Sequence, residues 1–265
     1  MHHWFMNTVF KIILALVLMV TPANAGMLFD LADDAIDCGS SIDNPTKLTI
    51  CAWVFPTSEG EGGNGIIWIK DAAGTTRKDF RFNSTNQLFF RVARATVTMS
   101  KNSADNTLPN GAWAHVCIVW DGTLGDAAND ITFYINGVEP ADGTLANGSG
   151  AITDDGTGTE HIGNRAGDTQ TWDGQIDEFY LWEDDLNAAE IAHLASSRVR
   201  RIGLQIRPST LRQYIPLDEV PNGNSGDGVT FRNLASPGTS DCTGDNGANN
   251  TGFTGAASSR VSYPE

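Results

Sequence analysis

The chain has 265 residues, a formal net charge of −15 and only 18% charged residues. Such an acidic surface repels nucleic acid and anionic membranes, so neither is expected as a partner. The 28 glycines are typical of many short strands joined by tight turns. The length accommodates one domain of roughly 170 to 180 residues together with a shorter extension.

Residues 1–25 have the pattern of a secretory signal. Lys11 precedes an apolar run from Ile12 to Val20, and the small-residue triplet 23–25 (ANA) follows. We expect cleavage after Ala25. The run has nine apolar residues, whereas a helix that spans a bilayer needs about 20. The sequence therefore predicts a secreted protein, extracellular or periplasmic, with no stable membrane insertion.

The segments that follow are predicted to be mostly strands. Residues 48–55 (LTICAWVF) and 115–120 (HVCIVW) alternate with apolar side chains on both faces, which is typical of strands inside a sandwich. Residues 131–135 also alternate. Asn136-Gly137 comes next and is the strongest short hairpin signal, because a type I′ turn needs positive φ at both central residues.

One helix is expected, over residues 188–197. Asn187 and Glu190 have the spacing of a capping box, and Ile191, Leu194 and Ala195 share one face. Because the stripe is apolar, we expect it to cover an open end or edge of the sandwich. Residues 222–228 and 239–254 are so polar and glycine-rich that loops are predicted there.

Four stretches together carry a family resemblance: residues 29–40, 48–56, 113–140 and 162–194, the last containing GQIDEFYLWEDDLNAAEI. They resemble the laminin G-like and pentraxin-like domains of the concanavalin A-like lectin/glucanase superfamily. The resemblance implies an all-β fold: a jelly-roll β-sandwich of two antiparallel sheets with one short C-terminal helix. We divide the chain into a signal peptide (1–25), a laminin G-like jelly-roll domain (26–200) and a C-terminal extension (201–265).

The extension contains YIPLDE (214–219), which is similar to the segment that usually precedes the lead strand in laminin G-like proteins. One interpretation is a circular permutation, in which one strand at residues 213–217 packs back on the same sandwich and polar loops follow it. The other is a truncated second module. The short length favours the first interpretation.

The resemblance also bears on the cysteines. In pentraxins a disulfide joins the two strands to which residues 48–53 and 114–120 are similar, and Cys51 and Cys117 stand at those positions. We therefore expect a Cys51–Cys117 bridge. The even count suggests a second bridge between Cys38 and Cys242, although two free, partly buried thiols are an equal alternative.

Catalytic motifs are missing from the sequence. There is no HExxH, no GxSxG and no paired-cysteine zinc spacing. The glucanases of the similar superfamily carry carboxylates two residues apart on one strand, whereas Glu178 and Glu183 are five apart and would face opposite sides. We expect a non-catalytic protein, with a glycoside hydrolase or lyase as the less favoured reading.

Calcium is the candidate ion, and no other cofactor is required. Pentraxins bind calcium after the strand that resembles HIGN, where Asp168 matches one ligand but Arg165 and Ala166 stand in place of Glu and Gln. A second candidate site is Asp177, which resembles a metal-binding aspartate of the glucanases, assisted by Asp33 or Asp34. The alternative is that Asp177 accepts hydrogen bonds from backbone groups at a strand end.

A shallow ligand site is conceivable in the loop that contains Arg165, Asp168, Trp172 and Asp173. An exposed Trp172 would stack on a sugar ring, although the similar family usually has a packed aromatic there. The other tryptophans of alternating strands, Trp53, Trp68, Trp120 and Trp182, are expected in the core.

The preferred function is a secreted, non-catalytic recognition module that binds carbohydrate or a cell-surface protein. The contacts would come from loops near residues 58–64, 121–130, 153–159 and 164–173. The alternative is a structural or assembly protein of a surface, a homo-oligomer in which the tail is exchanged between protomers. A polysaccharide hydrolase or lyase on the same scaffold comes third.

Overall fold

The structure is a computed structural model that describes residues 24–31, 33–72, 74–122, 125–156, 158–165, 169–196, 201–235, 240–245 and 254–257. The expected signal peptide, except for its last two residues, lies outside the described residues, and so does Asp168.

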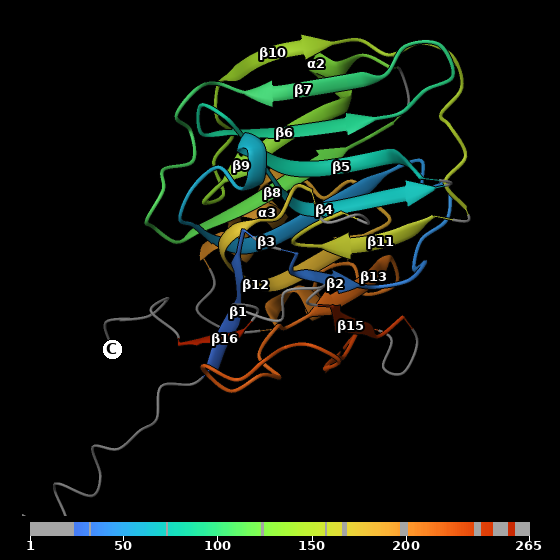
Figure 1. The fold of residues 1–265 in the computed structure, drawn as a ribbon. Helices are drawn as coiled ribbons and strands as arrows, with labels where there is room; N and C mark the ends of the chain where they lie inside the picture. The colour runs from blue at the N-terminus through green and yellow to red at the C-terminus, as the bar shows by residue number, and fades with distance from the viewer. Residues whose placement is uncertain are drawn as a thin grey trace, which may run out of the picture.

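The described strands form two antiparallel sheets that pack face to face (Figure 1). In spatial order the first, seven-stranded sheet contains β16 (Thr254–Ala257), β1 (Asn24–Asp30), β12 (Asp173–Trp182), β3 (Leu48–Pro56), β8 (Ala114–Trp120) and β9 (Ile131–Ile135), with β13 (Leu211–Ile215) also paired to β12. The second, nine-stranded sheet contains β10 (Asp142–Ala146), β7 (Met99–Ser103), β6 (Gln87–Val92), β5 (Thr75–Asn83), β4 (Asn64–Ala72), β11 (Thr159–Ile162), β2 (Ala35–Asp37), β15 (Cys242–Asp245) and β14 (Thr230–Phe231). This is the jelly-roll sandwich that the sequence predicts.

Alternation along the strands builds the core between the sheets. Phe80 and Phe82 of β5 face Trp120, Ile118 and other apolar side chains of the opposite sheet, all of them fully buried. The hairpin signal is also confirmed. Asn136 and Gly137 both have positive φ (51° and 79°), and Ile135 and Val138 exchange two backbone hydrogen bonds across them.

The helical elements are short: α2 (Ala127–Asp130), α3 (Ala188–Ser196), and the 3₁₀ turns η1 (Glu61–Gly63) and η2 (Ile202–Gln205). The capping box of α3 forms as expected. Asn187 Oδ1 accepts hydrogen bonds from the backbone N–H groups of Ala189 and Glu190, and the Asn187 N–H donates to Glu190 Oε2 at 2.8 Å. Ile191 and Leu194 of α3 are buried against the seven-stranded sheet.

Three of the four tryptophans expected in the core are fully buried: Trp68, Trp120 and Trp182. The prediction is wrong for Trp53, which is only half-buried and packs edge-on against His115 with ring centroids 5.4 Å apart. The reason is the face of the strand to which Trp53 belongs. Trp53 lies on the outer face of β3, where α3 and the tail cover other residues more completely.

A disulfide joins Cys51 of β3 to Cys117 of β8, which is the pairing that the family resemblance implies. The two residues stand directly opposite each other in the antiparallel register. Their sulfurs pack in a small apolar cluster with Tyr180, Trp182 and α3, on the outer face of the seven-stranded sheet. The bridge therefore fastens two central strands of this sheet together.

The tail belongs to the same sandwich, as the permutation interpretation expects. Strand β13 pairs with β12, and its Tyr214 and Ile215 are fully buried. The expectation of a single strand is too low, however, because the described part of the tail contributes four strands. β15 lies inside a predicted loop and β16 begins at the last residue of that loop, Thr254, because pairing with β2 and β1 fixes glycine-rich segments that have little strand preference of their own. The sandwich therefore extends beyond residue 200.

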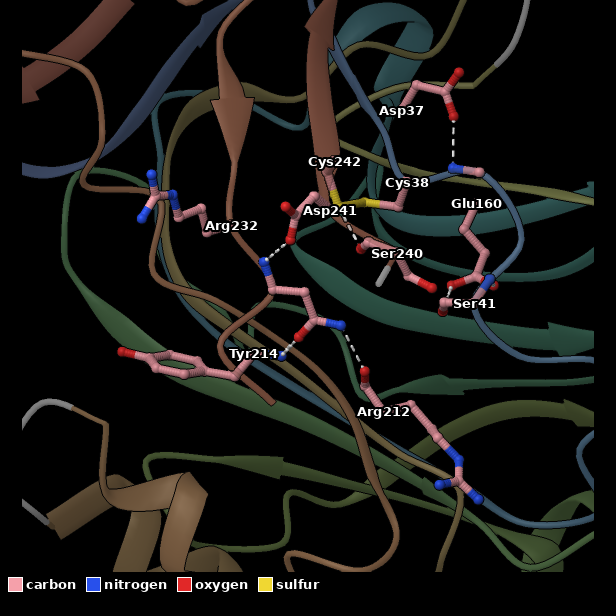
Figure 2. Close-up of a disulfide and its surroundings, with 12 residues drawn as sticks. Asp37, Cys38, Ser41, Glu160, Arg212, Tyr214, Arg232, Ser240, Asp241 and Cys242 are labelled. Atoms are coloured by element: carbon pink, nitrogen blue, oxygen red, sulfur yellow. Dashed lines mark hydrogen bonds between the residues drawn. A yellow bond between two sulfur atoms is a disulfide. The ribbon is translucent and has the colours of Figure 1, made fainter. Parts of the chain in front are cut away.

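Figure 2 shows how the tail is fastened to the start of the chain. Cys242 of β15 forms a disulfide with Cys38, which follows β2 directly. Next to the bridge, the fully buried Asn233 links its own segment to two others. Its N–H donates to Asp241 Oδ1 (2.8 Å), its Oδ1 accepts from the Tyr214 N–H (3.0 Å), and its Nδ2 donates to the Arg212 carbonyl (2.8 Å). Tail and sandwich thus form one packed unit.

Candidate ligand-binding face

The outer faces of the two sheets differ in how they are covered. On the seven-stranded sheet, Tyr180, Trp182 and Tyr214 pack with Ile191 and Leu194 of α3 in a second apolar cluster. On the nine-stranded sheet, Figure 1 shows β4 to β7 with no helix of the described chain across them, apart from the one-turn η1 next to the start of β4 and the last residue of β5. The outer face of β4 to β7 therefore carries no helix of the described chain, although Ile66 and Ile69 of β4, which pair with Arg81 and Asp79, are fully buried.

Strict alternation on β5 and β6 separates this face from the core. Phe80, Phe82, Leu88, Phe90 and Val92 point inward and are fully buried. The residues between them point outward, and the register places Asp79 opposite Arg91 and Arg81 opposite Phe89. The outer face of β5 and β6 is therefore charged and aromatic.

Asp79 lies at the centre of this face and is fully buried. Its Oδ1 accepts a short hydrogen bond from Arg91 Nε, and its Oδ2 lies 3.5 Å from Arg81 Nε. Burial raises the pKa of Asp79, while the charges of Arg91 and Arg81 act against that rise. One carboxylate thus orients two guanidinium groups, whose side chains are 31% and 14% exposed.

Phe89 and Arg165 complete the arrangement. The guanidinium carbon of Arg81 lies 4.1 Å from the centroid of the Phe89 ring, so the planar group stacks on the aromatic face. Burial lowers the pKa of Arg81, the charge of Asp79 raises it, and the positive charges of Arg91 and Arg165 lower it. Arg165 follows β11 in a loop, and its charge acts on Arg81. We call Asp79, Arg81, Phe89, Arg91 and Arg165 the arginine face.

The structure separates the residues that the sequence assigns to one shallow site. Arg165 is half-buried and belongs to the arginine face. Trp172 is fully buried and packs on Phe82 of the core, with ring centroids 5.9 Å apart, so its assignment as a sugar-stacking residue is wrong. Asp173 begins β12 of the seven-stranded sheet, where it pairs with Asp30 of β1. Asp168 lies outside the described residues, so its role stays a prediction.

The loop that resembles the pentraxin calcium site has a donor set that does not fit the ion. Asn164 Oδ1 already accepts hydrogen bonds from the N–H groups of Arg165 (2.8 Å) and Gln170 (3.2 Å). Its Nδ2 donates to Thr171 Oγ1 at 2.8 Å. The next side chain is the cation Arg165, which would repel calcium. A pentraxin-type site on the described part of this loop therefore has no support.

The second proposed calcium site is also dispersed in the structure. Asp34 Oδ2 accepts a hydrogen bond from the Asp30 N–H at the end of β1, and burial raises the pKa of Asp34 to about 7. Asp177 instead follows Ile176, which pairs with Met27 near the start of β1. Within the described ranges only Cys51, His115 and Cys117 bring three potential metal ligands within 4.8 Å, and both cysteines there are disulfide-bonded. Calcium at Asp33, Asp34 and Asp177 stays a prediction.

Comparison with known proteins agrees with this architecture. A laminin G-type family model, described as the concanavalin A-like lectin/glucanases superfamily, matches residues 30–192. The chain belongs to this superfamily. No curated protein matches the chain in sequence. The superfamily match confirms the resemblance and supports a binding module as the general class of function.

Solved structures of the superfamily fold extend the comparison. The chain is similar to a putative carbohydrate binding protein from Bacteroides ovatus, with 15% identity and a TM-score of 0.52 over 85% of this chain and 59% of that chain. It is also similar to the enzymatically active domain of tailspike protein 2 from Bacteriophage CBA120, with 14% identity and a TM-score of 0.51 over 74% and 30% of the two chains. A heptameric SAP-like pentraxin from Limulus polyphemus is 18% identical, with a TM-score of 0.48 over 66% and 82%. At these identities the likeness shows the fold alone.

Four residues of the arginine face were not found from the sequence: Asp79, Arg81, Phe89 and Arg91. The signal was present, because residues 78–92 alternate between core and outward side chains on both sides of a tight turn.

No helix in the described part of the chain has the length and apolar character needed to cross a membrane.

Proposed function

We propose that this protein is a secreted, non-catalytic recognition module that binds a carbohydrate or protein ligand on the outer face of its nine-stranded sheet. The observation that carries the proposal is the arginine face itself. An aromatic ring and several partly exposed guanidinium groups lie on a rigid sheet, and no helix of the described chain covers them. Rigid sheet positions of this kind hold binding groups more accurately than loops do.

The arrangement is suited to binding rather than to bond cleavage. Glycosidases that use two carboxylates need them about 5 to 10 Å apart and open to the substrate. Asp79 is fully buried and held by Arg91 and Arg81, so it is engaged in positioning these groups. A planar guanidinium and an aromatic ring instead provide hydrogen bonds and a stacking surface for a ligand.

Export is part of the proposal. Both disulfides, Cys38–Cys242 and Cys51–Cys117, require an oxidising compartment to form and persist. Together with the pattern of residues 1–25, they support secretion or periplasmic residence.

A glycan array probed with the purified mature protein tests the function. We expect reproducible binding to a restricted set of glycans, with binding measured in calcium and again in excess EDTA. Binding that survives EDTA assigns recognition to the protein's own side chains, whereas binding that requires calcium would favour one of the two predicted calcium sites, at Asp168 or at Asp177 with Asp33 or Asp34. A well-folded protein that binds no glycan and no cell-surface protein would contradict the proposal.

The other two functions have distinct signatures. A surface assembly protein would form stable homo-oligomers by light scattering and would bind no glycan. A hydrolase or lyase would release reducing ends or unsaturated products from a soluble polysaccharide, and a carboxylate substitution would abolish that turnover.

A further inference from the structure

Three arginines converge on one side of a strongly acidic protein. Arg81 and Arg91 share the buried carboxylate of Asp79, and Arg165 lies close enough for its charge to act on Arg81. The charge of Asp71 also reaches Asp79. Together the three arginines, Asp79 and Asp71 carry a formal charge of +1, or +2 without Asp71, on a chain whose net charge is −15.

From this juxtaposition we propose that the ligand is an anionic carbohydrate, whose carboxylate or sulfate groups bind Arg81, Arg91 and Arg165 while a sugar ring lies on Phe89. The inference rests on the proposed function and specifies the chemical class of its ligand.

The hydrogen-bonding state of the guanidinium groups supports an anion. Arg91 and Arg81 both turn Nε toward Asp79, and no hydrogen bond or ion pair to another described residue occupies the Nη groups of either side chain. Arg165 has no ion pair within the same described set. Guanidinium donors that are partly shielded from water bind most strongly to carboxylate or sulfate oxygens, which they can contact in pairs.

Electrostatics favours the same ligand class. Burial lowers the pKa of Arg81, the charge of Asp79 raises it, and Arg91 and Arg165 act on Arg81 as like charges that lower it. A bound anion would relieve this repulsion, whereas a neutral sugar would leave it in place. Outside the arginine face the net negative charge of the protein repels polyanions, so such binding has to come from a local group of cations.

The position of Phe89 and the order of side chains across β5, β6 and β7 give the proposed site a direction. Arg81 already covers part of the Phe89 ring at 4.1 Å from its centroid, and Phe89 remains half-buried rather than enclosed. Register places Asn102 of β7 next to Phe89, and Ser100 next to Arg91. A chain of sugars that crosses β5, β6 and β7 would therefore meet a cation, an aromatic ring and neutral polar groups in turn.

The test measures binding of three polymers to the intact mature protein by isothermal titration calorimetry: polygalacturonate, which carries only carboxylates, dextran sulfate, which carries only sulfates, and neutral dextran. We expect one or both polyanions to bind and dextran not to bind. Whichever polyanion binds more tightly identifies the anionic group. Raising the salt concentration should weaken binding.

Variants locate the site. Arg165→Gln is the cleanest, because its side chain supports no ion pair within the described fold, and Arg81→Gln and Arg81→Lys accompany it. Loss of a charge-assisted contact should weaken polyanion binding about tenfold. Arg81→Lys keeps the charge but loses the planar fork, so it should recover only part of the affinity. Arg212→Gln is the matched control, since Arg212 pairs with exposed Glu183 on the other sheet.

Three outcomes would overturn the inference, and one of them would also overturn the proposed function. Glycan binding that ignores charge and is unaffected by Arg165→Gln and Arg81→Gln would overturn the anionic ligand and leave the recognition function standing. Polyanion binding that Arg212→Gln weakens equally would show non-specific attraction and overturn the inference. Failure of the folded protein to bind any polymer or any glycan on the array would overturn both the inference and the proposed function.

Discussion

Removing the Cys38–Cys242 disulfide should destabilise the protein and release its tail. The two cysteines are 204 residues apart in sequence, and the Cys51–Cys117 bridge already bypasses 66 of these. The remaining closed path is about 140 residues, which corresponds to about 5 kcal/mol of unfolding free energy in the chain-entropy description. For a domain of this size such a loss lowers Tm by roughly 10 to 20 °C. The perturbation is the double variant Cys38→Ala with Cys242→Ala.

Circular dichroism gives the Tm, and hydrogen exchange with mass spectrometry locates the change. We expect faster exchange in β15 and in its partner β2, because the short β15 pairs with only three residues of β2. The double variant Cys51→Ala with Cys117→Ala is the control, and it should increase exchange in β3 and β8 instead. An unchanged Tm together with unchanged protection of residues 242–245 in the Cys38/Cys242 variant would refute the reasoning.

Three further predictions concern stability. Asn187→Ala should cost about 1 kcal/mol of unfolding free energy, because two backbone N–H groups at the start of α3 lose their acceptor; a urea titration measures it, and an unchanged midpoint would contradict the cap. Asn233→Ala should lower Tm and raise exchange in β13, since the Tyr214 N–H and the Arg212 carbonyl lose their side-chain partner while the backbone hydrogen bond to Asp241 remains; equal exchange in both proteins would count against this role. Burial raises the pKa values of Asp184 and Glu190, but hydrogen bonds from Arg207 outweigh it and bring both below their ordinary 3.8 and 4.5, so the resulting stabilisation is fully present above these ordinary values and is lost as the pH falls through the lowered ones. Arg207→Gln should therefore lower Tm by a few degrees at pH 7 and by less at pH 3, and an equal effect at both pH values would be inconsistent with the ion pairs.

Elements with a strong local pattern were predictable from the sequence. Residues 48–56 and 114–120 have apolar side chains on both faces, and the Asn187–Glu190 spacing specifies the start of α3. Strands β15 and β16 could not be recognised, because their glycine-rich sequences become strands only through partners some 200 residues earlier in the chain.

The functional residues show the same division. Trp172 lies in a polar loop, which suggested a sugar-stacking role, whereas the family resemblance implied a packed aromatic; its indole lies in the core against Phe82. Asp79, Arg81, Phe89 and Arg91 do follow a period of two. Their relation to Arg165 depends on the pairing of β11 with β4, which joins segments far apart in sequence, and no local pattern encodes that pairing.

Blocking the outer face of the nine-stranded sheet tests the central claim most directly. Ser100 lies on this face opposite Arg91, so Ser100→Trp fills the surface without changing the core. Val138 is 69% exposed beside the turn near α3, on the other layer, and Val138→Trp is the matched control. With the best ligand from the array, titration should show at least tenfold weaker binding for Ser100→Trp and wild-type affinity for Val138→Trp. Equal affinity of wild type and Ser100→Trp would contradict recognition through this face.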